Sequence, residues 1–194
     1  MDFSSYVVSI ATTGHGTLSV ADIEAGNGES EQTLIDRETD AVFTITADNG
    51  YELTAFTVNA EAKTPTDGQY TVTNLLADQT VTATFAPITY TITYDLAGGS
   101  VAAGLPGSYT IESAAITLPQ PTREGYTFAG WTGTALDGPA VEVTIAAGST
   151  GNRTYTATWT PIIYNITYTL NGGTVEGNPA TYTIESETFT LTAP

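Results

Sequence analysis

An internal repeat is the feature that most constrains the fold of this chain. Residues 87–101 align with residues 161–175 at a shift of 74, and 10 of the 15 aligned positions are identical. The Tyr-Thr-Ile-Glu-Ser stretch at 109–113 recurs unchanged at 182–186, and residues 81–87 are echoed at 155–161. Self-similarity at a fixed period is typical of arrays of small structural units. We therefore predict three modules: a divergent one at 4–87, a full one at 88–161 and an incomplete one at 162–194.

Apolar and polar residues alternate along nearly every segment. Ala41, Phe43 and Ile45 point one way and Val42 and Thr44 the other, and residues 81–85 and 155–159 follow the same rule. A period of two residues is that of a half-buried strand, and the many threonines and tyrosines suit a pleated surface with one wet side. No stretch carries a convincing helical stripe. Glycine-containing turns separate the strands at 14–16, 49–50, 66–68, 98–99, 137–139, 148–152 and 171–173. We predict a mainly β fold.

The predicted modules follow one another almost without linkers. A strand pattern ends at Pro87 and again at Pro161, and the next strand pattern starts at once. Proline stiffens such a joint because its ring fixes φ. We expect the modules to form an elongated rod, to which each module adds about 30 Å.

The charge of the chain excludes one large class of partner. With 21 acidic and 4 basic residues, the net charge is −17. Such a surface repels nucleic acid and anionic lipid head groups within a Debye length of about 8 Å. The chain has no cysteine, and no apolar run approaches the roughly 20 residues of a membrane span. Residues 1–3 lead directly into a strand pattern, so we expect no signal peptide within the given sequence.

An aromatic signature marks the second module. Residues 119–131 read Pro-Gln-Pro-Thr-Arg-Glu-Gly-Tyr-Thr-Phe-Ala-Gly-Trp, which places Tyr126 and Phe128 on one face of a strand. Gly130 allows a bulge before Trp131 is reached. Residues 48–56 are an earlier echo, with Phe56 where Trp131 falls. The tryptophans at 131 and 159 are the expected core anchors, and truncating either costs about 3–5 kcal/mol if it is buried.

These motifs carry a resemblance to a known family. Residues 88–161 resemble the Listeria–Bacteroides repeat, the B-repeat of internalin-type bacterial surface proteins. The resemblance is carried by the strand at 90–95, the double glycine at 98–99, the aromatic signature and the stretch 148–159. Residues 162–194 resemble the first half of another copy, and residues 4–87 a divergent relative. The resemblance implies β-grasp-like modules in tandem, on exported proteins at the bacterial cell surface. It supplies no catalytic residue, no cofactor and no metal site.

The residues alone offer four candidate sites. The acidic stretch at 22–31, interpreted as a loop, could supply oxygen ligands to calcium, although it lacks the spacing of a calcium-binding loop. His15 lies in a predicted turn, where a catalytic role is not expected. Lys63, the only lysine, lies in a predicted exposed loop, where an intramolecular amide crosslink is not expected. Scattered acids on thin sheets do not predict the paired carboxylates of a glycosidase.

The sequence therefore favours a non-catalytic stalk, spacer or adhesive segment over an enzyme. The alternative is a carbohydrate- or protein-binding surface module, in which some of the 11 tyrosines would stack on sugar rings. Most tyrosines occupy inward positions of the strand pattern, which favours core packing instead. The expected partner is an unidentified host or cell-surface protein or glycan. Residues 162–194 lack the closing strands, so we also expect them to be covered by the second module or to pair through an open edge with a neighbour.

Overall fold

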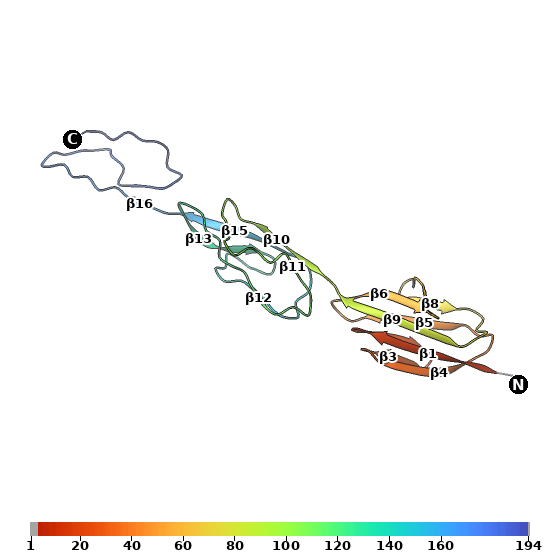
Figure 1. The fold of residues 1–194 in the computed structure, drawn as a ribbon. Helices are drawn as coiled ribbons and strands as arrows, with labels where there is room; N and C mark the ends of the chain where they lie inside the picture. The colour runs from red at the N-terminus through yellow and green to blue at the C-terminus, as the bar shows by residue number, and fades with distance from the viewer. Residues whose placement is uncertain (1–3, 194) are drawn as a thin grey trace. The chain divides into compact units, whose positions relative to one another are not determined.

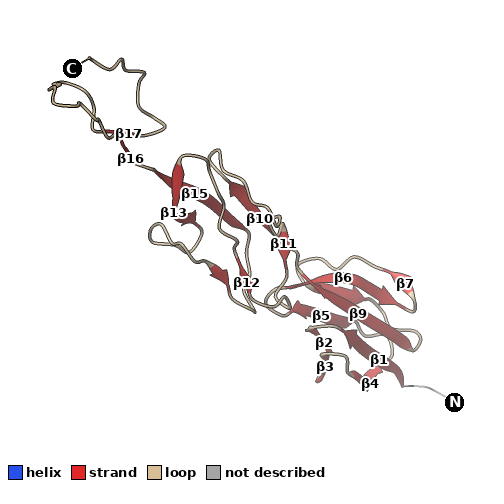
Figure 2. Cartoon of the chain, turned by 60° about the vertical axis from the view of Figure 1, so that its left-hand side comes forward, coloured by secondary structure: helices blue, strands red, loops and turns tan. Residues whose placement is uncertain are grey.

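The computed structural model describes residues 4–193, and in this range it contains strands and turns but no helix (Figures 1 and 2). The mainly β prediction is therefore confirmed. Two units separate in space: one comprises the described residues up to Thr89 together with Thr110–Glu112, and the other comprises Tyr90–Tyr109 and the described residues from Ser113 onward. The described range holds no helix that could cross a membrane. The start at residues 1–3, for which no signal peptide was expected, lies outside the described residues.

The first unit is built from two sheets. One contains β1 (Ser5–Thr13), β4 (Ser30–Asp36), β6 (Tyr51–Val58), β7 (Glu61–Ala62) and β9 (Gln79–Pro87), in the order β4-β1-β9-β6-β7. The other contains β2 (Gly16–Val20), β3 (Ile23–Gly26), β5 (Ala41–Ala47) and β8 (Gln69–Val72), in the order β3-β2-β5-β8. Every described neighbour pair is antiparallel except β1 and β9, which run parallel.

Both sheets of the first unit face one core. Val8, Ile10 and Phe85 come from the five-stranded sheet, whereas Leu18 and Phe43 come from the four-stranded sheet, and all are buried in the same cluster. Burial alternates along β5, as the period of two predicts. Sheet-on-sheet packing of this kind needs no helix to cover the apolar faces.

The second unit has three long strands and several of only two residues. Its main sheet contains β10 (Tyr90–Asp95), β11 (Ser108–Tyr109), β13 (Tyr126–Gly133) and β15 (Arg153–Pro161), in the order β11-β10-β15-β13. The strands β12 (Ile116–Thr117) and β14 (Thr144–Ile145) form a separate pair, as do β16 (Tyr164–Asn165) and β17 (Thr181–Tyr182). The first strand again pairs in parallel with the last, β10 with β15. The two modules therefore share the central pairing of their main sheets.

A bulge places a buried aromatic residue of each module, Phe56 or Trp131, at the same point. The register of β13 against β15 shifts between Phe128 and Gly130, and the register of β6 against β9 shifts between Leu53 and Ala55. Gly130 has a φ of 137°, which confirms the predicted bulge and explains the glycine. After the bulges, Trp131 pairs with Ala157 and Phe56 with Ala83. The predicted correspondence of Phe56 and Trp131 is confirmed.

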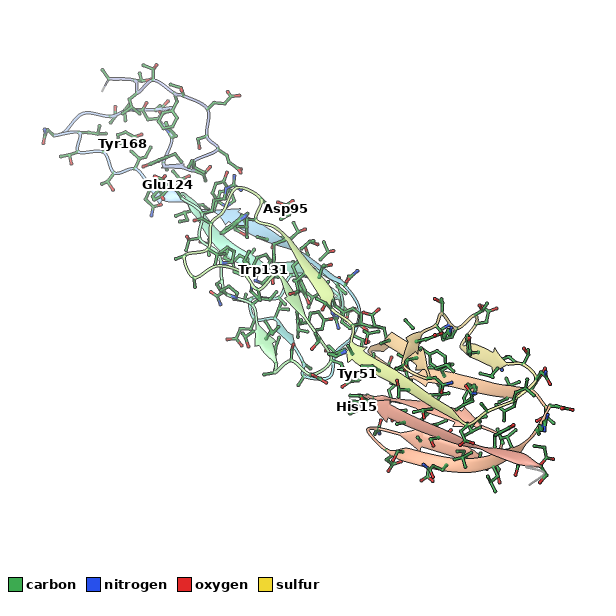
Figure 3. All side chains as sticks on the ribbon, turned by 45° about the vertical axis from the view of Figure 1, so that its right-hand side comes forward. His15, Tyr51, Asp95, Glu124, Trp131 and Tyr168 are labelled. Carbon is green, nitrogen blue, oxygen red and sulfur yellow. The ribbon has the colours of Figure 1, made fainter. Side chains whose placement is uncertain are left out.

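The two tryptophans are not equivalent in burial. Trp131 is fully buried in the second core beside Tyr155 and Ile92 (Figure 3). Trp159 is only half-buried, and its Nε1–H donates a hydrogen bond to the Leu96 carbonyl at 3.1 Å. The expectation of core anchors is therefore confirmed for Trp131, whereas Trp159 only packs partly buried against the same core. The reason is that Trp159 lies two residues before the end of β15, where it covers the edge of the core.

Residues 162–193 repeat the local structure of residues 88–118 without forming a core. Tyr94 donates to the Pro106 carbonyl at 3.0 Å, and Tyr168 donates to that of Pro179 at 2.8 Å. No residue of this described stretch is buried. The expectation that the stretch is covered by the second module is met only locally: Ile184 packs against Gly125, Glu185 accepts a hydrogen bond from Tyr126, and the Ile162 amide donates to the Gly125 carbonyl.

Candidate functional site

The acidic stretch at 22–31 is not a loop, so that interpretation was wrong. Strands β3 and β4 occupy most of it, joined by a turn at 27–28. Ala25 is buried and Glu24 is exposed, a strand alternation too short to recognise in an acid-rich sequence. In residues 4–193, no group of three or more acidic or histidine side chains is placed to hold a metal ion. The candidate calcium ligands are therefore not brought together.

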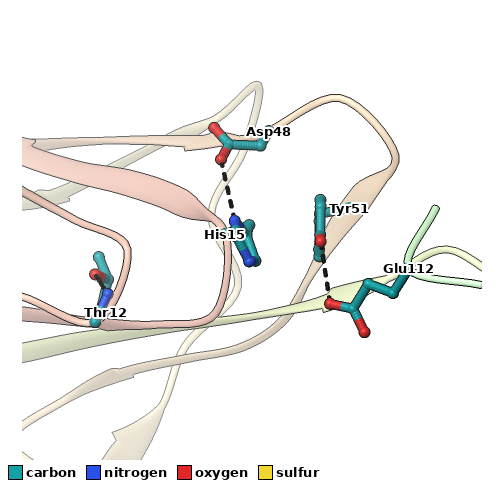
Figure 4. A network of polar contacts seen from close by, with 6 residues as sticks. Thr12, His15, Asp48, Tyr51 and Glu112 are labelled. Atoms are coloured by element: carbon teal, nitrogen blue, oxygen red, sulfur yellow. Dashed lines mark hydrogen bonds and ion pairs between the residues drawn. The ribbon is translucent and has the colours of Figure 1, made fainter. Parts of the chain in front are cut away.

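His15 lies in the turn between β1 and β2, as predicted, and packs against the Gly-Tyr turn that opens β6. Its ring stacks on Tyr51 with 4.5 Å between centroids, and its Nδ1 lies 3.8 Å from the Asp48 carboxylate (Figure 4). The side chain is about half exposed, at 53%. This arrangement buttresses Tyr51, a role that the sequence did not suggest.

Lys63 follows the short strand β7 and has a local partner. Its Nζ donates a hydrogen bond to Glu61 Oε2 at 2.9 Å. This hydrogen bond, together with the negative charge of Glu61, raises the pKa of Lys63. The amine is thus held as a cation by a carboxylate two residues away, which is an ordinary surface ion pair.

The grooves of the first unit do not assemble ionisable groups. A groove of about 610 Å³ is lined by Tyr6, Val7, Leu34, Leu76 and Asp78, among others. The Asp78 carboxylate already has a structural partner, because its Oδ1 accepts a hydrogen bond from the Val7 amide at 2.8 Å. Catalysis requires a pocket with convergent acids, bases or nucleophiles, and this groove does not offer that arrangement.

Six of the 11 tyrosines lie in or pack against the two core clusters, which confirms the core-packing prediction for most of them. Of the 11, only Tyr109 and Tyr155 are buried, whereas Tyr164 and Tyr182 are exposed and the remaining seven are half-buried. Tyr164 and Tyr182 stack on each other across β16 and β17 with 5.2 Å between ring centroids. Both exposed rings lie in the described part of residues 162–194, where no residue is buried.

The most organised polar contacts lie at two Gly-Tyr turns. In the first unit, the Tyr51 hydroxyl donates to Glu112 Oε1 at 3.0 Å, within the Thr110–Glu112 segment that belongs to this unit (Figure 4). In the second unit, the Tyr126 hydroxyl donates to Glu185 Oε1 at 2.9 Å. Each tyrosine is the first residue of its strand, β6 or β13, and each follows a glycine with positive φ. The same contact therefore occurs twice.

The two phenols are also held in their neutral form. Desolvation, followed by the hydrogen bond and charge of Glu112, raises the pKa of Tyr51. The hydrogen bond to Glu185, followed by desolvation, raises the pKa of Tyr126, against the opposing charge of Arg123. The Arg123 guanidinium lies 3.7 Å from the centre of the Tyr126 ring. A neutral phenol is the form that can donate to a carboxylate.

Comparison with known proteins gives the family. Residues 90–158 match the model of the Listeria-Bacteroides repeat domain, and residues 6–89 match that of the divergent InlB B-repeat domain. Residues 6–158 are tandem B-repeats. The resemblance seen in the sequence is thereby confirmed, including the divergence of the first module. No curated protein and no solved structure matches the chain. B-repeats of this kind are repeat domains of bacterial surface proteins.

The Tyr–Glu contacts were not predicted, although the sequence contains a signal for them. The identical stretch at 109–113 and 182–186 includes both glutamates, and a Gly-Tyr pair stands at 50–51 and 125–126. What the sequence did not show is that these motifs meet, because 61 and 59 residues separate the bonded side chains.

Proposed function

We propose that this chain is a non-catalytic structural segment of a bacterial cell-surface protein, a stalk or spacer made of tandem β modules. The modules comprise residues 4–87, 88–161 and 162–194. The parallel pairing of first and last strands, flanked by antiparallel partners, supports a β-grasp-like description of the first two. The high acidity suits an exported, solvated surface.

The observation that carries the proposal is the repeated joint between successive modules. Only residues 88–89 separate β9 from β10, and only residues 162–163 separate β15 from β16. The amide of Ile88 donates to the Gly50 carbonyl, and the amide of Ile162 donates to the Gly125 carbonyl, both at 2.9 Å. A connection this short and doubly repeated restrains the chain far more than a flexible linker does.

Small-angle X-ray scattering of the whole chain tests the stalk. A compact globule of 194 residues has a radius of gyration of about 16 Å, whereas a rod of modules that each add about 30 Å gives about 25 Å. Insertion of a Gly-Ser-Gly-Ser linker after Pro87 should convert a rigid elongated profile into a flexible one. A value near 16 Å for the unmodified chain would overturn the rod.

The exposed ring pair Tyr164–Tyr182 favours a second candidate, an adhesive module that binds carbohydrate or protein. Two stacked, exposed aromatic rings offer an apolar face of the kind that sugars or partner side chains contact. A glycan array separates the two candidates. Binding that is lost in the Tyr164→Ala variant supports adhesion, and absence of binding supports a spacer.

A further inference from the structure

We propose that the Gly-Tyr turn of each B-repeat is a docking site for the Thr-Ile-Glu turn of the repeat that follows it. We call the two elements together the Tyr–Glu clasp: Gly50, Tyr51 and Glu112 in the first unit, and Gly125, Tyr126 and Glu185 in the second. The partner that this surface fits is therefore another B-repeat with the same turn. This inference extends the proposed function. It depends on that function only for the order in which the repeats follow one another along the chain.

The clasp recurs with the same geometry. The phenol-to-carboxylate distances are 3.0 and 2.9 Å. At both places the glycine before the tyrosine also accepts a hydrogen bond from the isoleucine that follows the proline, Ile88 or Ile162. The turn thus binds the following repeat at two points, its first residue and its glutamate. Two independent occurrences in one chain make an accidental surface contact a poor explanation.

Each glutamate is also oriented by a local hydrogen bond within its own turn. The Glu112 amide donates a hydrogen bond to Thr110 Oγ1 at 3.3 Å. Glu185 donates in the same way to Thr183 Oγ1 at 3.2 Å, and the Ser186 amide closes the turn on the Thr183 carbonyl at 3.1 Å. Threonine is suited to this local bond because its short hydroxyl reaches the amide two residues on.

The glycine of the turn fits its partner closely. A methyl group at Gly125 would lie 2.7 Å from Ile184 Cδ1 and 2.9 Å from Ile184 Cβ. The positive φ of 75° at Gly125 also favours glycine. The isoleucine of the Thr-Ile-Glu turn therefore packs where any larger residue would block it. In the second unit the recognition elements are an apolar contact with Ile184 and a hydrogen bond that the Tyr126 hydroxyl donates to Glu185.

Glu38 occupies the position in the first module that matches Glu112 in the second, but its contacts differ. It stands three residues after Ile35, which pairs with Tyr6, just as Glu112 stands three residues after Tyr109, which pairs with Tyr90. Glu38, however, has a φ of 63°, and its amide donates to the Leu75 carbonyl. Its carboxylate pairs with Arg37 at 3.2 Å. Glu38 is therefore a matched control.

The test is a site-resolved titration of the whole chain, with ¹³Cζ-labelled tyrosine followed by NMR. Tyr51 and Tyr126 should titrate above the ordinary tyrosine value. Glu112→Gln should lower the value of Tyr51 only, Glu185→Gln that of Tyr126 only, and Glu38→Gln neither. The other charged or polar groups facing these phenols are Asp48 and His15 at Tyr51 and Arg123 at Tyr126, and all remain unchanged in these variants. A Tyr51 value that does not respond to Glu112→Gln overturns the clasp in the first unit.

Amide hydrogen exchange gives an independent readout of docking. The Ile88 and Ile162 amides should be protected in the unmodified chain, and Tyr51→Phe should speed exchange of Ile88 by about tenfold while leaving Ile162 unchanged. Equal exchange of the Ile88 amide in Tyr51→Phe and in the unmodified chain would overturn the proposal. The result is separable from that of the scattering experiment, because a clasp can form in a chain that is not a rod, and a rod can form without the clasp.

Discussion

The double glycine of the full repeat makes a sharp prediction about packing. Trp159 lies over Gly99: a methyl group added at Gly99 would overlap Trp159 Cζ2, and it would lie 3.0 Å from Trp159 Cη2 and 3.1 Å from the Thr122 carbonyl oxygen. Gly99 has no positive φ, so the backbone itself tolerates alanine. The main effect of Gly99→Ala is therefore the forced displacement of the indole, with a smaller strain against the Thr122 carbonyl.

The magnitude follows from what the displaced indole loses. Overpacking a fitted contact costs about 1–3 kcal/mol. Moving Trp159 also breaks its hydrogen bond to the Leu96 carbonyl, a loss of about 0.5–1.5 kcal/mol. Gly99→Ala should lower the free energy of unfolding of the second unit by about 2–4 kcal/mol. Gly138→Ala is the control, because nothing lies within 4 Å of a methyl group there, and it should change stability by less than about 0.5 kcal/mol.

The assay is urea unfolding followed by tryptophan fluorescence, and a double-mutant cycle decides the cause. Both tryptophans of the chain, Trp131 and Trp159, lie in the second unit, so their fluorescence reports that unit alone. Trp159→Phe removes the atoms that the new methyl group would strike, so Gly99→Ala should cost less than about 1 kcal/mol in that background. Trp131 remains as the reporter. Equal costs of Gly99→Ala in the two backgrounds would refute the packing argument.

Three further predictions follow from burial, titration and ligand chemistry. Trp131→Ala should destabilise the second unit by about 3–5 kcal/mol and Trp159→Ala by clearly less, because only Trp131 of the two is fully buried. Urea unfolding followed by circular dichroism measures both losses, and equal losses would contradict this. Desolvation, followed by the proximity of Tyr155, raises the pKa of Tyr94 to about 12. The neutral phenol should therefore contribute fully to the free energy of unfolding below pH 10, and this contribution should be lost as the pH rises through about 12. In Tyr94→Phe the free energy of unfolding should fall less steeply over the same pH range. Calcium should leave the unfolding midpoint unchanged, since the described acids form no metal cluster, and a raised midpoint would reverse that conclusion.

Local features of the fold were predictable because they follow from local chemistry. The alternation at 41–47 predicted the buried face of β5, and the glycine before Trp131 predicted the bulge. The echo of residues 48–56 in 123–131 predicted that Phe56 and Trp131 occupy one structural position. Each of these inferences needs only the period of a strand and the steric freedom of glycine.

Features that depend on distant pairing were not predictable in the same way. A period of two assigns faces but not neighbours, so it could not reveal that β1 pairs in parallel with β9, about 70 residues away. It also failed at residues 22–31, where strand β3 has only four residues and acids mask the alternation. The clasp contacts between Tyr51 and Glu112 belong to the same class, because nothing local requires two exposed polar residues to meet.

The difference between the two B-repeats follows from the size of their cores. In the described part of the chain, the core cluster of the first unit contains 14 buried residues drawn from two sheets, and that of the second contains eight. A core with fewer members needs a larger side chain at its centre. Accordingly, Phe56 suffices in the first, whereas the second uses Trp131 at the same position after the bulge. It does so although the buried Nε1–H of Trp131 meets no acceptor among the described residues, a penalty of about 1–3 kcal/mol. The gain from filling that volume must exceed this penalty, whereas the first unit fills its core from a second sheet that carries Leu18 and Phe43.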